Sequence, residues 1–241
     1  MIEVRNLSKV YGARVALCDV SFKITNGRVY GLLGADGAGK TTLLHLLAGC
    51  LAPTEGCVKI NGFDLQREPL KAKRCLGYLP AASPLYDRLT VWEYLSFVAE
   101  AKGVSYERAV RQVEEVMELT GILSLQKKLI RRLSEIQRRR TGLAQALLGN
   151  PEIVLLDEPT VGLTPAQCAE MRALICRLGE LKTVIVSSQS AAEIGELCDR
   201  VLILEHGSLT AIAEAADLRK GLLSCAGCTK DEASRIKEEA P

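Results

Sequence analysis

Residues 34–42 read Gly-Ala-Asp-Gly-Ala-Gly-Lys-Thr-Thr, which fills every fixed position of the GxxxxGK[ST] phosphate-binding motif. An apolar segment, Val29 to Leu33, precedes the motif, and a second apolar segment, Thr41 to Ala48, follows it. The first predicts a short buried strand and the second a helix, which is the context that the motif requires. A chance glycine-rich turn needs neither neighbour, so the sequence predicts binding of a nucleoside triphosphate.

Each residue type in this segment has a predicted task. The glycines let the backbone curve until its N–H groups surround phosphate oxygens, and the helix N-terminus adds partial positive charge. Lys40 is predicted to reach the β- and γ-phosphates, and the Thr41 hydroxyl to ligate Mg²⁺. The candidate nucleotide-binding residues here are Gly34, Ala35, Asp36, Gly37, Ala38, Gly39, Lys40, Thr41 and Thr42.

A second candidate segment lies far downstream, where the apolar run Ile153 to Leu156 ends in Asp157, Glu158 and Pro159. A carboxylate at the end of a strand can hold Mg²⁺ through water, and a neighbouring carboxylate can orient or deprotonate an attacking water. Asp157 is therefore the candidate metal residue and Glu158 the candidate general base. A lone Asp-Glu pair is commonly an acidic turn, but the complete phosphate motif favours the catalytic interpretation.

Composition limits the function classes. The 241 residues are 48% hydrophobic, enough for one large α/β domain or two small ones. Nine cysteines, an odd number scattered through the chain, favour reduced thiols in a cytosolic compartment. Cys225 and Cys228 form one C-x-x-C pair, for which inert thiols are the favoured interpretation. The sequence has neither a signal-peptide core nor a run of about 18 apolar residues, so we expect no insertion into a membrane by the chain alone.

The net charge of +2 gives no global electrostatic case for nucleic acid. A basic run between residues 127 and 140 is the local exception, but no aromatic residues interrupt it. We expect a solvated or phosphate-facing helix start there rather than a platform for stacking bases. The run consists of Lys127, Lys128, Arg131, Arg132, Arg138, Arg139 and Arg140.

The hydrophobic pattern predicts an α/β fold. The first third reads as mixed β structure, with strands at 2–4 and 15–24 and a hairpin arm at 57–60. After residue 150, predicted strands at 153–156, 183–186 and 201–204 alternate with helices from Pro165 and near Ala191, which indicates parallel strands with helical crossovers. The tail from Ala215 is charged and is expected to be a loose helix. Between residues 90 and 123 an amphipathic helix pattern predicts core positions at Ala109, Val110, Val113, Val116 and Met117.

With a phosphate loop, a helical insert and a Walker B strand in this order, the chain resembles the ATP-binding subunit of an ABC transporter over nearly its whole length. It is most similar to single-domain subunits of bacterial exporters whose permease is a separate chain. The resemblance implies a P-loop NTPase core of ABC ATPase type, an antiparallel β layer at the N-terminal side and an α-helical subdomain inserted at about 82–147. It implies one nucleotide-binding domain over 1–220, followed by a charged tail over 221–241.

Further landmarks follow from the resemblance. Tyr11 stands where the family places an aromatic ring on adenine, although a loop-packing tyrosine is the simpler alternative. Ser134 begins the signature segment, which in the family covers the nucleotide of the partner subunit. The segments that look like the loop and groove receiving the permease are 77–80, 84–87 and 89–94, and 198–204 resembles the last core strand.

Four landmarks depart from the family pattern. Ala81 replaces the glutamine or glutamate of the glutamine loop, and Glu135 and Ile136 replace both glycines of the LSGGQ signature. In the family this segment faces the γ-phosphate held by the other subunit, so Glu135 brings a carboxylate toward an anion. Arg138 is placed to neutralise the Glu135 carboxylate in part. At the D-loop, Thr164 replaces aspartate but still predicts a capping box with Gln167 and proline at the first helical position.

The fourth departure is Gln189, which stands where the family carries a histidine that contacts the γ-phosphate. Glutamine can donate a neutral hydrogen bond, but it cannot carry charge. Loss of one transition-state donor typically costs about 3 kcal/mol. The candidate catalytic residues are therefore Glu158, Lys40 and Gln189, with turnover expected to be reduced.

The resemblance implies binding and hydrolysis of ATP with Mg²⁺, driving a separate transmembrane permease after two ABC subunits close around nucleotide. The expected location is cytoplasmic, peripheral at the inner face of the cell membrane, with membrane contact only through the permease and with no nucleic acid partner. A nucleotide-binding regulatory module with little hydrolysis is the alternative. A soluble ABC protein acting on nucleic acid is disfavoured, because such proteins usually fuse two domains. The sequence does not identify the transported substrate, and it does not distinguish a homodimer from a heterodimer.

Overall fold

Alternating apolar residues in the first third of the chain build an antiparallel sheet. The computed structural model describes residues 1–25 and 27–220. In this sheet the strand order is β2-β1-β4-β5, and every pairing is antiparallel, as the resemblance implied. The predicted hairpin arm is present, but the first strand continues well beyond Val4. The strands are β1 (Ile2–Tyr11), β2 (Arg14–Ile24), β4 (Glu55–Ile60) and β5 (Phe63–Asp64).

The second sheet has the order β10-β9-β3-β8-β7-β6, and only β10 runs antiparallel to its neighbour. Strands β3, β8 and β7 are neighbours although they lie far apart in the sequence. Because parallel strands end at the same edge of a sheet, the segments that follow these three strands meet there. The strands are β3 (Val29–Leu33), β6 (Leu76–Leu79), β7 (Ile153–Asp157), β8 (Thr183–Ser188), β9 (Arg200–Glu205) and β10 (Ser208–Glu214).

Both faces of this parallel sheet are covered. Along β7, Ile153 and Leu155 point into a core shared with the antiparallel sheet and helix α1. Val154 and Leu156 point into a second core shared with α6, α7 and the helices inserted before β7. Alternate residues of a strand face opposite sides, so one apolar run serves two cores. The covering helices are α1 (Lys40–Leu47), α2 (Pro69–Arg74), α6 (Pro165–Gly179), α7 (Ala191–Leu197) and α8 (Ala215–Arg219).

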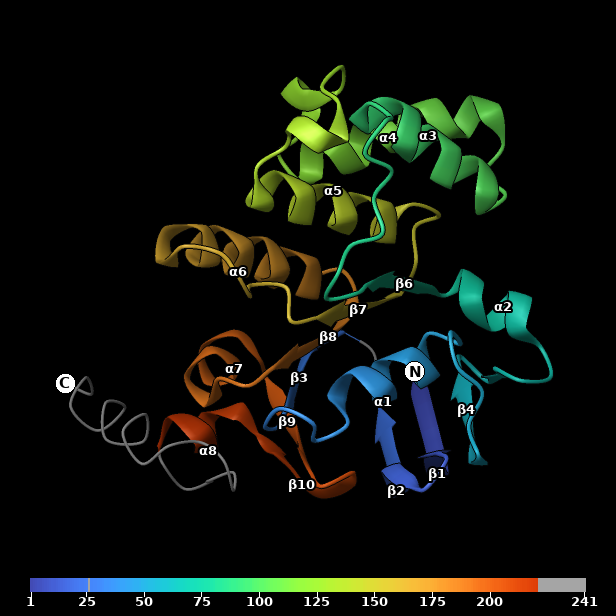
Figure 1. Cartoon of the computed structure of the whole chain (residues 1–241), viewed down its shortest axis with the longest axis vertical. Coiled ribbons are helices and arrows are strands. Elements are labelled where there is room, and N and C mark those ends of the chain that lie inside the picture. The colour runs from blue at the N-terminus through green and yellow to red at the C-terminus, as the bar shows by residue number, and fades with distance from the viewer. Residues whose placement is uncertain (26, 221–241) are drawn as a thin grey trace.

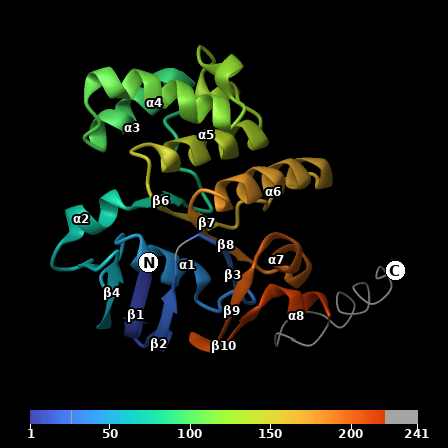
Figure 2. The ribbon, with the colours of Figure 1, turned by 180° about the vertical axis from the view of Figure 1, so that it is seen from behind.

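The helices between β6 and β7 gather at one end of the molecule, away from the antiparallel sheet (Figure 1). The view from behind gives the same arrangement, with α5 next to β6 and α6 to one side of it (Figure 2). We call the segment from α3 to α5 the helical insert. Its elements are α3 (Val91–Ala101), α4 (Tyr106–Leu119), the 3₁₀ turns Leu123–Leu125 and Ile130–Arg132, and α5 (Glu135–Leu147).

Several local predictions need correction. Val113, Val116 and Met117 are buried as expected, but Val110 is 40% exposed because it faces outward into a groove between α3 and α4. The segment assigned to a loop at 77–80 is mostly strand β6, which pairs with β7. Strand β10 had no counterpart among the predicted strands. The predicted capping box at the start of α6 is confirmed, since Thr164 and Gln167 bond to each other's backbone N–H groups.

The helix expected from Ala215 begins as α8, whereas the rest of the tail, 221–241 with Cys225 and Cys228, lies outside the described residues. Among residues 1–25 and 27–220, no helix combines the length and the apolar character needed to cross a membrane.

Candidate functional site

The phosphate motif forms a tight loop between β3 and α1. Gly39 precedes α1 with a φ of 107°, and a Cβ on it would lie 2.7 Å from the carbonyl oxygen of Ala16 in β2. A Cβ on Gly34 would lie 2.5 Å from the carbonyl oxygen of Leu204 in β9. Any side chain at either position would collide with backbone, so close packing against two strands, and not only curvature, requires glycine here.

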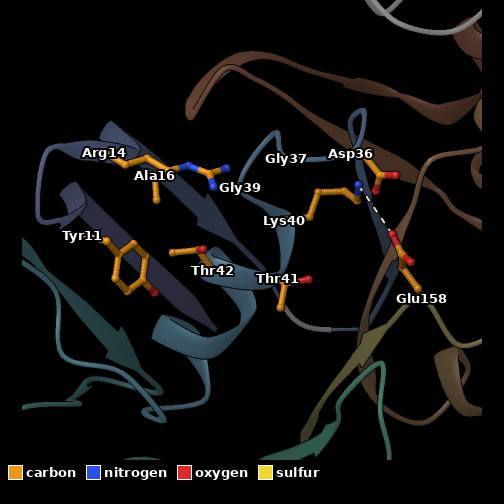
Figure 3. Close-up of a pocket in the computed structure, with 10 residues that line it drawn as sticks. All are labelled: Tyr11, Arg14, Ala16, Asp36, Gly37, Gly39, Lys40, Thr41, Thr42 and Glu158. Atoms are coloured by element: carbon orange, nitrogen blue, oxygen red, sulfur yellow. Dashed lines mark ion pairs between the residues drawn. The ribbon is translucent and has the colours of Figure 1, made fainter.

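Lys40 lies at the centre of this loop and is only 5% exposed. Its ammonium donates to the carbonyl oxygens of Gly34 at 2.8 Å and Ala35 at 3.0 Å. It also lies 3.6 Å from Oε1 of Glu158, the ion pair drawn in Figure 3. A buried cation needs such partners. Because charged acceptors bind an ammonium more strongly than neutral carbonyls do, a phosphate group competes well for Lys40.

A cavity of about 420 Å³ opens in front of the loop (Figure 3). Tyr11 lies at one end of it and Glu158 at the other, so the predicted aromatic contact and the predicted general base face the same space. Arg14 also lines the cavity, and it belongs to no motif from which it could be predicted. The lining residues are Tyr11, Arg14, Ala16, Asp36, Gly37, Gly39, Lys40, Thr41, Thr42 and Glu158.

Asp157 ends β7 and is fully buried. Its Oδ1 accepts a 2.6 Å hydrogen bond from the Ser187 hydroxyl, while its Oδ2 is buried without a hydrogen-bond partner among the described residues. A buried, unpaired carboxylate oxygen beside a phosphate loop fits a bound cation. The described residues hold no cluster of three His, Cys, Asp or Glu side chains, so such a cation would share its remaining ligands with phosphate, water and Thr41.

Glu158 adopts a left-handed backbone conformation, with φ at 46°. For a residue with a side chain this costs about 1–3 kcal/mol, and such strain is found most often at functional sites. The N–H group of Glu158 donates a 2.9 Å hydrogen bond to Ser187 Oγ. One hydroxyl thus holds both acidic residues, since Ser187 accepts from Glu158 and donates to Asp157. Ser187 was not predicted, because its only signal is a polar residue near the end of a buried strand.

Gln189 follows β8 and joins the phosphate loop to Glu158. Its side-chain amide nitrogen donates to Oδ1 of Asp36 at 2.7 Å and to Oε1 of Glu158 at 3.1 Å. Three of the predicted residues therefore lie together, although they come from three separate segments. The contact with Asp36 was not predicted.

Ser134 and the signature segment lie elsewhere, at the start of α5, and Ser134 is not among the residues lining the cavity. The expectation that Arg138 neutralises Glu135 is wrong. Arg138 pairs with Asp87 at 2.8 Å, whereas Glu135 lies 3.4 Å from Arg139. Arg139 is only 7% exposed, so the basic run is not uniformly solvated as expected.

Comparisons with known proteins agree with this geometry. A protein-family model described as "ABC transporter" matches residues 17–161. The linearmycin resistance ATP-binding protein LnrL of Bacillus subtilis is 33% identical over 90% of this chain and 70% of its own length. The bacitracin transport ATP-binding protein BcrA of Bacillus licheniformis is 35% identical over 87% of this chain and 68% of its own length.

Solved structures show the same architecture. The ATP-binding cassette MJ0796, solved as a dimer in a post-hydrolysis state with ADP and phosphate, superposes with a TM-score of 0.81 and 25% identity. The superposition covers 89% of this chain and 99% of that one. The phosphate loop, the paired acidic residues and these relatives lead to one conclusion: the chain belongs to the ABC transporter family and is an ATP-binding subunit of the ABC ATPase type.

Proposed function

We propose that this chain hydrolyses ATP slowly, with Mg²⁺, and that hydrolysis drives a separate transmembrane permease. The observation that carries the proposal is that Lys40 and Glu158 meet at one end of the cavity and that Gln189 contacts Glu158 there. Lys40 and Gln189 lie 3.6 Å and 3.1 Å, respectively, from the same oxygen of Glu158. A cation for the γ-phosphate, a base for water and a neutral donor therefore share one small volume.

The residues divide the work as follows. The N–H groups of the phosphate loop and Lys40 bind the β- and γ-phosphates, and Tyr11 contacts the adenine ring. Thr41 and Oδ2 of Asp157 are the residues that would hold Mg²⁺, which supplies charge neutralisation when bound. Glu158 accepts the proton of the attacking water, and Lys40 and Gln189 hold one oxygen of its carboxylate.

Slow turnover follows from Gln189 and Ala81. The Gln189 amide places a neutral donor where a charged one would stabilise the developing negative charge better, and a lost interaction of this kind costs about 3 kcal/mol. Ala81 presents only a methyl group, so it can neither bind Mg²⁺ nor orient water through its side chain. Both deficits act on one transition state, so their effects need not add.

The dimer and the permease are proposed on separate grounds. The related cassette MJ0796 was solved as a dimer, and we infer that a second ABC subunit covers the cavity here with its signature segment. Large apolar side chains are exposed on the helical insert, with Phe97 at 48% and Tyr106 at 85%, and Tyr86, just before α3, is 52% exposed beside Phe97. Such a patch fits a protein partner. A permease in that place would hold the chain at the cytoplasmic face of the membrane.

Glu135 and Gln189 also support a second candidate, a regulatory module that closes on ATP without useful turnover. Co-expression with a candidate permease separates the two functions. The transport proposal predicts that the permease raises the rate of phosphate release about tenfold or more. A regulatory module would bind the permease and ATP with no change in that rate.

A further inference from the structure

The buried guanidinium of Arg139 joins three chain segments beside the catalytic site. Its Nη1 donates to the carbonyl oxygen of Ala81, and its Nη2 donates to the carbonyl oxygen of Val161 at 3.3 Å. Its Nε lies 3.4 Å from a carboxylate oxygen of Glu135, one turn earlier on α5. The three partners belong to the entrance of the helical insert, to the turn after β7 and to the signature helix.

The burial of this cation makes its partners important. Arg139 is only 7% exposed, and a buried charge is tolerated only where acceptors replace water. Nε has no hydrogen bond within the described residues despite the nearby carboxylate, so Glu135 contributes charge while the two carbonyls fix the direction of the guanidinium. The contacts to Ala81 and Val161 therefore determine the geometry.

Each carbonyl belongs to a segment with a defined place in the fold. Ala81 follows β6, where the chain leaves the sheet to enter the helical insert. Val161 follows Glu158 by one turn, and its N–H group donates to the carbonyl oxygen of Glu158 at 3.3 Å. These hydrogen bonds connect α5 through Arg139 to Val161, and Val161 to the backbone of the general base.

We propose that Arg139 is a positioning residue for hydrolysis, which fixes the turn 158–161 relative to the helical insert. Ala81 has no polar side chain, so its backbone carbonyl is the group through which this segment is held. A guanidinium can reach two carbonyls at once because its donors form a planar fork. A lysine ammonium keeps the charge but lacks the fork.

The test compares Arg139→Lys and Arg139→Met with Arg138→Met. Arg138 is the matched control, since it is the adjacent arginine on α5 and its partners, Asp87 and the Ile130 carbonyl, do not involve the turn 158–161. Three quantities are measured in each variant. They are kcat for phosphate release, the Kd of the Mg²⁺ complex of a non-hydrolysable ATP analogue, and the rate of hydrogen exchange of the backbone amides in 158–164 without nucleotide.

For both Arg139 variants we expect kcat to fall about tenfold or more while Kd changes by less than about twofold, and exchange in 158–164 to accelerate. The control should leave all three near the wild-type values. If Arg139→Lys keeps both kcat and exchange at wild-type levels, or if Arg138→Met reproduces the losses, the proposal is wrong. If the methionine variant does not fold, the lysine variant alone tests the proposal. If the wild type hydrolyses no ATP, hydrogen exchange still tests the proposal, because the exchange measurement does not depend on the proposed function.

Discussion

The side-chain amide of Gln189 donates a 3.1 Å hydrogen bond to Oε1 of Glu158. The same nitrogen donates to Asp36, so the amide lies between two carboxylates. We expect Gln189→His to raise the rate of phosphate release by about tenfold or more, because an imidazole held between two carboxylates carries positive charge toward the γ-phosphate. Steady-state phosphate release measures the effect. Gln189→Ala is the control and should not exceed the wild-type rate. An unchanged rate in the histidine variant would show that position 189 does not limit turnover.

The second prediction concerns nucleotide binding. Lys40→Ala removes the buried ammonium of the phosphate cradle, and charge-assisted bonds to two phosphates are lost with it. The affinity for Mg²⁺-ATP should fall about 100-fold or more. Titration calorimetry measures this affinity, with the exposed Lys73→Ala as the control outside the cavity. Equal affinities in the two variants would mean that the phosphate loop does not bind the triphosphate.

The third prediction concerns Ser187, whose hydroxyl bonds to both Asp157 and the Glu158 N–H group. Ser187→Ala leaves buried polar groups unpaired, so the free energy of unfolding should fall by about 1–3 kcal/mol. The rate of phosphate release should fall as well. Ser188→Ala is the matched control, since Ser188 bonds to Glu193 and to the Ser190 N–H group. Thermal unfolding and phosphate release are measured on both. A similar loss of turnover in the control would contradict a specific role for Ser187.

The fourth prediction tests the signature segment. Glu135→Gly with Ile136→Gly should increase ATP-dependent dimerisation in a Glu158→Gln background. The reason is that a carboxylate a few ångströms from a γ-phosphate is repelled by about 1 kcal/mol even at high effective dielectric. Arg139 pairs with Glu135 and reduces this repulsion, so Glu135→Gln alone should have the smaller effect. Light scattering reports the dimer. If the double glycine variant stays monomeric in ATP, a heterodimer with a second ABC subunit becomes the preferred arrangement.

Local patterns made much of this site predictable. The phosphate loop, Asp157 and Glu158 follow short buried strands, and strand, turn and helix signals within about ten residues are enough to place them. The relatives confirm the family that these motifs indicated. The roles of the individual site residues stay predictions that the variants above test.

The contacts that escaped prediction are long-range or depend on orientation. Ser187 and Arg139 act on groups that the sheet and the helical insert bring close, and single-sequence periodicity carries no information about such pairs. Arg138 and Arg139 are adjacent in sequence, but a helix turns about 100° per residue, so one meets Asp87 and the other is buried against two carbonyls. Val110 fits the apolar period of α4 but lies at the edge of its buried face.

The most direct test of the account is phosphate release by the wild type and by Glu158→Gln at saturating ATP, with Mg²⁺ and with excess chelator. We expect slow release by the wild type that requires Mg²⁺. The rate in Glu158→Gln should be at least about 100-fold lower, although this variant still binds Mg²⁺-ATP. Equal rates in the two proteins, or release that persists without Mg²⁺, would contradict hydrolysis at this site.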